Sequence, residues 1–131
     1  MRLLLVCLGG ALGSGLRYLF GLLSARLLGL TFPFGTLGVN LLGSFLISLI
    51  IGLSLSAGVG GSAPISPTLR LFLTTGVMGG LTTYSAFNHE VLTLLEDGAQ
   101  PRALLYVAVT LLGCLAMGAS GLWLSRQLLA R

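Results

Sequence analysis

Long apolar stretches alternate with short polar or turn-forming stretches along this chain. A helix needs ~20 predominantly apolar residues to cross the hydrocarbon core of a bilayer, and each stretch is long enough. The pattern predicts four membrane-spanning helices, at about residues 3–28, 34–57, 70–96 and 102–128.

The connections between these helices are short. GVGGSAPISP (58–67) joins the second and third, and EDGAQP (96–101) joins the third and fourth. The N-terminus imitates a signal peptide, but its apolar character runs well past the 7–15 residues of a signal core, which favours a retained first span. We therefore predict an all-α membrane protein with a single four-helix transmembrane domain over residues 1–131.

The third stretch contains a segment unlike an ordinary spanning helix, GVMGGLTTYSAFNHE (76–90). Gly79, Gly80 and two threonines precede two aromatic residues, and glycine leaves its backbone accessible. Broken backbone at membrane depth is tolerated only where protein or a wet cavity surrounds it, and transporters commonly hold ions there. The segment predicts a broken third helix in an ion-handling protein.

Composition narrows the class of protein. Only 8% of the residues are charged, against about 25% in soluble domains. The net charge is +4, but the seven cations are scattered arginines that form no basic patch, so we expect no nucleic-acid partner.

The arginines leave the orientation in the membrane open. Four spans put Arg2, Arg70, Arg126 and Arg131 on one side, and Arg17, Arg26 and Arg102 on the other. Positive residues favour the cytoplasmic side, and four against three is a weak bias. Either a single topology or an antiparallel dimer is compatible with this count.

The second span carries polar residues at every fourth position: Thr36, Asn40, Ser44 and Ser48. Residues four apart drift by only ~40° around a helix, so these share one face. A buried asparagine is costly unless it is paired or faces a wet path. The stripe predicts either an ion path or contacts between helices, where Ser and Thr commonly pack.

The fourth span has the same spacing of weakly polar residues at Tyr106, Thr110 and Cys114. The third span contains two further polar side chains, Tyr84 and Ser85. These groups supply polar hydrogens without a fixed charge, which suits a small, strongly hydrated anion. Hydroxyl and amide oxygens can also face a cation, so the donors alone do not decide the sign of the ion.

The aromatic residues allow two interpretations, and the glycine pairs have a simpler one. The edges of Tyr84 and Phe87 can touch an anion and their faces a cation, but ordinary core packing explains both residues as well. The pairs Gly9/Gly13 and Gly76/Gly80 form GxxxG patterns, which predict close helix packing and no chemistry.

Charged and nucleophilic groups do not assemble an enzyme site. Arg17 lies inside the first span, where it needs a partner or a wet vestibule that would concentrate anions. Glu90 lacks the second carboxylate that hydrolysis of the glycosidase type requires. One histidine with Cys7 and Cys114 makes no metal site, and no Walker loop or nucleophile elbow occurs.

Three motifs, in their order and spacing, resemble the Fluc family of fluoride channels, also called CrcB proteins. They are GGALGSGLRY (9–18), FPFGTLGVNLLGSF (32–45) and TTGVMGGLTTYSAFNHE (74–90), and the likeness covers essentially the whole chain. The resemblance implies a dual-topology homodimer of antiparallel subunits with two fluoride pores. It also implies a structural sodium ion on the dimer axis, held by the backbone carbonyls of Gly79 and Thr82.

The resemblance also implies roles for individual side chains. By motif, the pore asparagine falls at Asn40 and the vestibule arginine at Arg17. The pair of pore phenylalanines falls at Tyr84 and Phe87, and the glutamate after them at Glu90. The polar track maps to Ser85, Tyr106, Thr110 and Cys114.

Three positions depart from the usual family pattern. Tyr84 and Ala86 stand where Phe and Thr are common, and Cys114 stands where a serine is expected. A thiol is a poorer donor than a hydroxyl, so the last departure bears on the fluoride path.

We therefore expect a passive fluoride-selective channel of the inner cell membrane that lets cytoplasmic fluoride leave the cell. The alternative is a small four-span multidrug or cation exporter, which needs a carboxylate in its first span, and this first span has none. A third interpretation is a non-transporting assembly factor, in which the polar stripes would only pack.

Overall fold

The structure is a computed structural model that describes residues 1–55 and 65–130, and every element in these ranges is helical. In chain order the elements are α1 (Arg2–Leu28), α2 (Phe34–Leu55), α3 (Pro67–Leu71), the π-helical segment η1 (Phe72–Met78), α4 (Gly79–Leu81), α5 (Tyr84–Glu96) and α6 (Gln100–Leu129). The predicted all-α class is confirmed.

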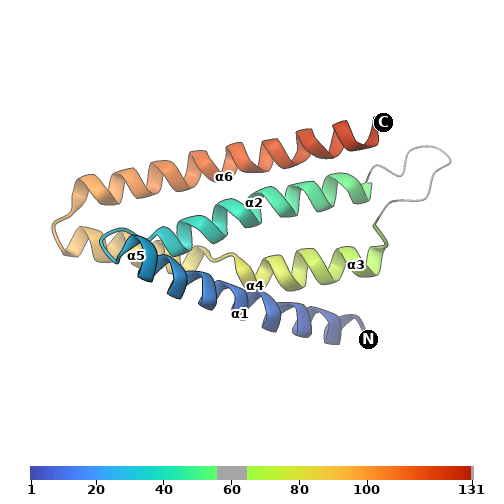
Figure 1. Cartoon of the computed structure of the whole chain (residues 1–131), viewed down its shortest axis with the longest axis horizontal. Coiled ribbons are helices and arrows are strands. Elements are labelled where there is room, and N and C mark those ends of the chain that lie inside the picture. The colour runs from blue at the N-terminus through green and yellow to red at the C-terminus, as the bar shows by residue number, and fades with distance from the viewer. Residues whose placement is uncertain (56–64, 131) are drawn as a thin grey trace.

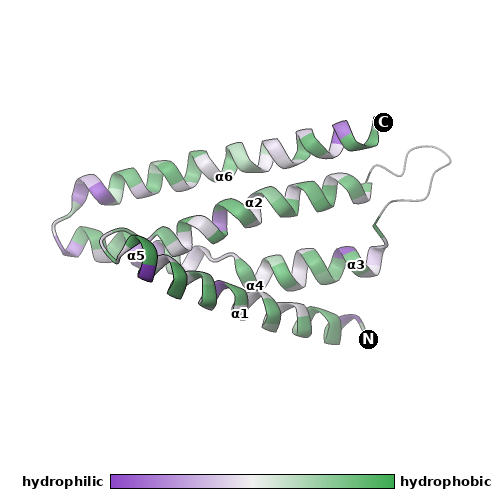
Figure 2. Cartoon of the chain, in the orientation of Figure 1, coloured by the Kyte–Doolittle hydropathy of each residue, from purple (hydrophilic) through white to green (hydrophobic). Residues whose placement is uncertain are grey.

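Three of the described helices, α1, α2 and α6, are long and apolar enough to cross a membrane. They correspond to the spans predicted at 3–28, 34–57 and 102–128, although residues 56–57 lie outside the described residues. Apolar residues cover most of their length, and hydrophilic ones gather towards the ends of the bundle (Figure 2).

The connections follow from turn chemistry. Gly29 ends α1 with φ 82°, and Gly98 turns the chain between α5 and α6 with φ 73°, a region that disfavours residues with a Cβ. The connection predicted over 96–101 is shorter than expected, because Pro101 already lies in the first turn of α6, where its missing N–H costs nothing. Most of the loop predicted over 58–67 lies outside the described residues, and its last residue, Pro67, begins α3.

The segment expected as the third span is divided among α3, η1, α4 and α5. Thr82 and Thr83 are extended between α4 and α5, with ψ of 155° and 122°. Gly79 and Gly80 both lie within helical α4, so the interruption falls after them, at Thr82 and Thr83. The extended residues are β-branched threonines, which favour that conformation.

The helices run along one long axis, with both termini at the same end (Figure 1). α2 packs along α6, while α1 packs along η1 and α4. α5 lies against α6 at the end opposite the termini. This arrangement places the extended threonines in the middle of the bundle, facing α2.

Close approach of α1 to η1 and α4 depends on glycine. A Cβ at Gly13 would overlap the carbonyl oxygen of Val77, and one at Gly76 would lie 3.0 Å from the Cα of Gly9. A Cβ at Gly80 would collide with the backbone of α1. The prediction that the GxxxG pairs allow close helix packing is confirmed.

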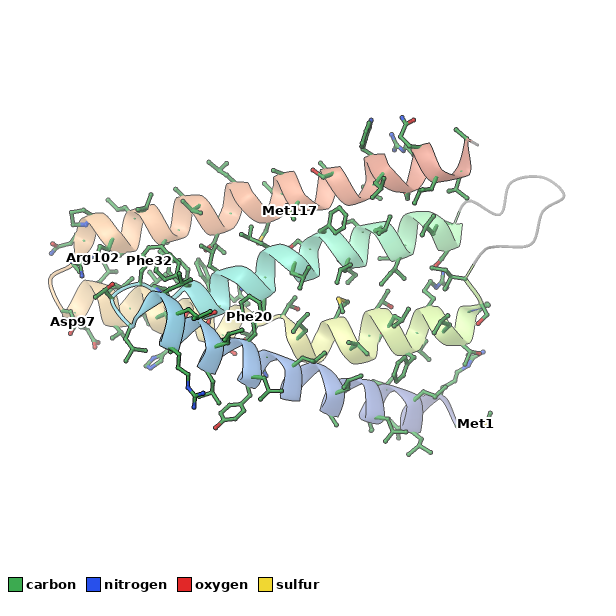
Figure 3. All side chains as sticks on the ribbon, viewed as in Figure 1. Met1, Phe20, Phe32, Asp97, Arg102 and Met117 are labelled. Atoms are coloured by element: carbon green, nitrogen blue, oxygen red, sulfur yellow. The ribbon has the colours of Figure 1, made fainter. Side chains whose placement is uncertain are left out.

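Large apolar side chains project outward along most of the bundle, as the sticks in Figure 3 show. The buried hydrophobic cluster is small and consists of Val39, Val77, Met78 and Leu81. An apolar exterior around a small core suits a protein whose solvent is lipid.

Candidate functional site

The side chain of Asn40 pairs with the backbone of Thr83. Asn40 Nδ2 donates to the carbonyl oxygen of Thr83 at 3.0 Å, and the Thr83 N–H donates to Asn40 Oδ1 at 2.9 Å. Both residues are buried, and an unpaired backbone group there would cost about 1–3 kcal/mol. The amide of Asn40 therefore replaces the helical hydrogen bonds that the extended residues cannot make.

Two carbonyl groups lose their usual helical donors at this point. In an uninterrupted helix the Thr83 N–H would bond to Gly79 and the Ala86 N–H to Thr82. Here Thr83 N–H bonds to Asn40, and Ala86 N–H bonds to the hydroxyl of Thr83 at 3.2 Å. The backbone oxygens of Gly79 and Thr82, the predicted sodium ligands, are thereby released from these bonds.

A cavity of about 400 Å³ lies beside the extended threonines, between α2, α5 and α6. We call it the Asn40 cavity. No carboxylate occurs among the residues that line it. It brings together six of the residues predicted from the sequence for the fluoride pore: Asn40, Ser44, Tyr84, Phe87, Thr110 and Cys114.

The hydroxyl of Thr110 lines this cavity without a partner. Thr110 is only 6% exposed, and its Oγ1 makes no hydrogen bond to any residue that the structure describes. Buried polar groups are almost always paired with protein, water or a ligand. Cys114 follows one turn later on α6, partly buried, and lines the same cavity.

The serines of the predicted stripes are differently placed. The Ser44 hydroxyl donates to the Asn40 carbonyl at 2.7 Å, so its hydrogen is occupied within α2. Ser85 does not line the cavity, and its hydroxyl lies 3.1 Å from that of Thr83. Ser48 lies farther along α2 and packs next to Gly118 of α6. A Cβ added to Gly118 would lie 3.3 Å from the hydroxyl oxygen of Ser48.

Glu90 ties three helices together at the edge of the site. Its Oε1 accepts from Thr36 Oγ1 at 2.6 Å, and its Oε2 accepts from Tyr106 Oη at 2.7 Å. These bonds join α5 to α2 and α6. Tyr106 is fully buried and packs edge-on against Phe87 and Phe32, so its hydroxyl is directed to the carboxylate and away from the Asn40 cavity.

The two aromatic residues predicted as a pair have different environments. Their ring centroids lie 5.7 Å apart at an interplanar angle of 50°. Phe87 is 6% exposed, whereas Tyr84 is 75% exposed. Phe87 is therefore a fixed wall of the cavity, and Tyr84 lies at its open side.

Two further cavities lie near this region, and the larger of them reaches the α5–α6 turn. The first, of about 390 Å³, is lined by Arg17 together with Thr36, Thr83 and Ala86. No ion pair of Arg17 occurs within the described part of the chain, and its role in a vestibule stays a prediction. Thr36 and Thr83 each line two cavities, so they lie between neighbouring cavities.

The outermost cavity is the most polar end of the site. It measures about 590 Å³, and His89, Glu90, Asp97 and Arg102 contribute to its lining. Figure 3 shows Asp97 and Arg102 at the end of the bundle where α5 turns into α6. Charge of both signs therefore surrounds this mouth, in contrast to the uncharged Asn40 cavity.

Two residues of the site were not selected from the sequence: Thr83, which is the N-cap of α5, and Met78, which lines the Asn40 cavity. Thr36 belongs to the predicted stripe, but its hydrogen bond to Glu90 was not predicted. Thr83 could have been predicted from the sequence, because a threonine just before a helical stretch is a capping signal. Nothing in the sequence pairs Thr36 with Glu90, since 54 positions separate them.

Comparisons with known proteins agree in family. The family model described as CrcB-like protein, Camphor Resistance (CrcB), matches residues 4–122. A protein of Anaeromyxobacter dehalogenans named "Fluoride-specific ion channel FluC" is 53% identical over 127 residues, which cover 97% of each chain. Proteins of the same name from Chelativorans sp. and Thermus thermophilus are 43% and 53% identical over 98% and 80% of this chain, and over 98% and 79% of their own.

These relatives are named as ion channels, not as enzymes, and the three apolar helices fit a multi-pass membrane protein. A family model that matches most of the chain, together with relatives of this identity and coverage, settles its membership. The chain belongs to the CrcB-like family.

Proposed function

We propose that this protein forms a passive, fluoride-selective channel through which cytoplasmic fluoride leaves the cell across the inner membrane. The observation that carries the proposal is the hydroxyl of Thr110 in the Asn40 cavity, which has no partner in residues 1–55 and 65–130. A buried donor without a partner is satisfied when an acceptor enters the cavity. The names of the relatives indicate fluoride as that acceptor.

The lining of the cavity supports an anion over a cation. Fluoride is small and strongly hydrated, so it must exchange water hydrogens for protein hydrogens. Asn40 uses one hydrogen of Nδ2 on Thr83, and the second is available to a ligand. The buried Phe87 also lines the cavity, and the edge of an aromatic ring carries positive partial charge that can meet an anion. No carboxylate among the lining residues opposes an anion there.

Passive transport fits the placement of the acidic groups better than a proton-coupled exporter does. An exporter of the small multidrug type needs a carboxylate in the first span, and α1 contains none. Glu90 has a hydrogen bond to each of its oxygens, from Thr36 and Tyr106. A carboxylate held in this way is suited to fixing three helices together.

The assembly that we propose is an antiparallel homodimer with two pores. Residues 67–96 would then cross the membrane as one span, interrupted at Thr82 and Thr83, which brings the number of spans to four. A sodium ion would join the subunits through the carbonyls of Gly79 and Thr82. Support for that site comes from the two N–H groups diverted to Asn40 and Thr83, because they leave these oxygens available to a hard cation.

Fluoride efflux from liposomes that hold the purified chain tests the channel proposal. We expect efflux down the fluoride gradient, at a rate that an imposed proton gradient does not change. Efflux that depends strictly on proton exchange would reject a channel. Absence of fluoride efflux, with intact folded protein in the liposomes, would reject fluoride as the transported ion.

The sodium and dimer proposals need a separate test. A Cβ at Gly79 would have only Thr74 O nearby, at 3.8 Å, so the first atom of a valine side chain meets no obstacle within one chain. We expect this variant to lose the dimer, and the parent to form fewer dimers in a large organic cation than in sodium. Gly10→Val is the matched control, since a Cβ there meets nothing within 4 Å. If neither Gly79→Val nor the replacement of sodium by the organic cation changes the amount of dimer, the sodium site is refuted.

Antiparallel assembly also has a direct readout in cells. A single reporter cysteine placed in the 58–67 loop, with the native cysteines removed, should be labelled from both faces of the membrane. Labelling from one face only would exclude dual topology and leave one fixed orientation.

A further inference from the structure

Two sulfur-bearing side chains from different helices line the Asn40 cavity. Met78 comes from the end of η1 and is 6% exposed, and Cys114 comes from the middle of α6. The described residues contain no group of three or more His, Cys, Asp or Glu side chains that could hold a metal ion. A thiolate and a thioether are soft ligands, and no carboxylate or imidazole lines the cavity beside them, so the pair favours soft cations.

We propose that Cys114 and Met78 bind a soft, thiophilic metal cation such as Hg(II) inside the Asn40 cavity, and that the bound metal stops ion passage. The blocking effect rests on the proposed channel function, because it requires that the cavity be part of the ion path. Binding of the metal does not depend on that function.

The unpartnered hydroxyl of Thr110 indicates that dissolved species reach this cavity. Thr110 precedes Cys114 by one helical turn on the same wall, and its buried Oγ1 has no partner among the described residues. Such a group calls for water or an ion from the cavity. At about 400 Å³ the cavity exceeds the roughly 30 Å³ share of one water molecule many times, so a metal complex fits.

The chemistry at Cys114 is a ligand exchange without oxidation or reduction. With mercuric chloride, the sulfur of Cys114 forms a bond to mercury while the S–H bond and one Hg–Cl bond break. The proton goes to water, and chloride leaves as the anion. The thioether of Met78 can then take the place of the second chloride, which gives mercury two sulfur ligands.

Obstruction follows from the position of the sulfur atoms. The walls of the cavity include Asn40, Phe87 and Thr110, the groups that we propose to contact the permeating anion. A metal complex attached to Cys114 fills part of the same space. Serine at this position would offer no soft ligand, so the cysteine makes the path of this chain sensitive to thiophilic metals.

Cys7 provides an internal control. The chain has two cysteines, and Cys7 is exposed on α1, outside the residues that line the Asn40 cavity. A mercury adduct at Cys7 should leave ion passage unaffected. Cys7→Ser therefore isolates Cys114, and Cys114→Ser isolates Cys7.

The experiment treats the full chain in liposomes with mercuric chloride and records two readouts. Intact mass counts the adducts, and fluoride efflux is compared with the untreated rate of the same variant. For Cys7→Ser we expect one adduct, efflux reduced to the leak of empty liposomes, and recovery after an excess of a small thiol. For Cys114→Ser we expect one adduct and no change from its own untreated rate, and for the double variant no adduct.

Met78→Leu tests the second ligand against a matched hydrophobic side chain. Less thiol should then be needed to remove mercury from Cys114, while the adduct still forms. Removal that requires as much thiol as in Cys7→Ser protein would overturn the role of Met78.

Two further outcomes would overturn the proposal. If the Cys7→Ser protein gains no adduct, Cys114 is not a metal site. If it gains the adduct and efflux continues at the untreated rate, the metal does not block ion passage. Failure of the channel function is recognised separately, because untreated protein would then carry no fluoride while intact mass still reports metal binding.

Discussion

Two buried polar groups that line the Asn40 cavity from different helices have opposite hydrogen-bonding states. Asn40 on α2 is paired through both its oxygen and its nitrogen with the backbone of Thr83. Thr110 on α6 is equally enclosed, but its hydroxyl has no partner in the described residues. Both residues belong to stripes with the same spacing of four, so spacing does not distinguish them.

The difference arises from what each helix faces. α2 faces the extended residues between α4 and α5, whose backbone groups need donors and acceptors, and Asn40 supplies both. α6 faces the cavity at Thr110, where no backbone group competes for the hydroxyl. The α2 wall therefore holds the backbone in shape, and the α6 wall remains open to a ligand.

Asn40→Asp should have the largest effect, because it disrupts the hydrogen bonds between residue 40 and the backbone of Thr83 and adds a negative charge to the cavity. An ionised aspartate cannot donate to the Thr83 carbonyl, so stability should fall by ~1–3 kcal/mol. Its negative charge should also reduce fluoride efflux to the liposome leak. Thermal unfolding in detergent and efflux from liposomes measure the two effects.

Ser48→Ala is the control for this change, since Ser48 shares the stripe but lies outside the residues that line the cavity. Its efflux and stability should match the parent. An Asn40→Asp protein that folds and conducts at the parental rate would show that Asn40 serves packing alone.

Thr110→Val should reduce efflux without reducing stability. Loss of a hydrogen bond to an ion costs ~1.5–3 kcal/mol, which corresponds to a roughly 10- to 100-fold decrease in rate if the transition state loses it fully. The folded protein loses only an unpaired hydroxyl, so its unfolding temperature should stay the same or rise. Thr110→Ser keeps the hydroxyl and should retain most of the efflux.

A Thr110→Val protein that is less stable than the parent would contradict this assignment. The hydroxyl would then have a structural partner, and the contrast between the two walls would disappear.

Thr83→Val should separate the side chain of Thr83 from its backbone. Valine keeps the shape but cannot accept the hydrogen bond from Ala86, and loss of a helix cap costs ~1 kcal/mol. The pairing with Asn40 uses the backbone and should persist, so efflux should fall far less than in Asn40→Asp. Thermal unfolding compared with Thr93→Val checks this, because Thr93 bonds only within its own exposed helical turn.

If Thr83→Val loses as much efflux as Asn40→Asp, the Thr83 hydroxyl itself serves the ion. The paired wall would then contribute more than backbone shape.

Sequence alone could predict much of this fold because apolar length and glycine spacing are local signals. They give three of the helices to within a few residues, and the GxxxG pairs give the packing of α1 on η1 and α4. The exact place of the extended residues was not predictable in this way. Gly79 and Gly80 have the freedom to bend, but close packing on α1 keeps Gly80 in a helix, and Asn40 stabilises the extended form at Thr83 instead.

The same limit applies to the candidate site. The stripes identify residues that the structure brings around one cavity, because helical periodicity fixes the face of each helix. Hydrogen-bond partners depend on the rotation and depth of neighbouring helices, which no pattern within one helix reports. For this reason the partner of Asn40, and the link of Thr36 and Tyr106 through Glu90, required the structure.

Tyr84→Phe should have the smallest effect on efflux. It tests whether the part of the cavity that is open to a ligand includes Tyr84 as well as Thr110. Tyr84 lines the cavity but is 75% exposed, and its ring contacts Phe87 while its hydroxyl donates to no described residue. Removal of such a group normally changes a free energy by less than about 0.5 kcal/mol, so efflux should stay within roughly twofold of the parent. Tyr106→Phe is the contrasting variant, because it removes a hydroxyl bonded to Glu90 and should lower the unfolding temperature. An efflux loss in Tyr84→Phe as large as that in Thr110→Val would place the Tyr84 hydroxyl on the ion path. The region left open to a ligand would then extend from α6 to the first turn of α5.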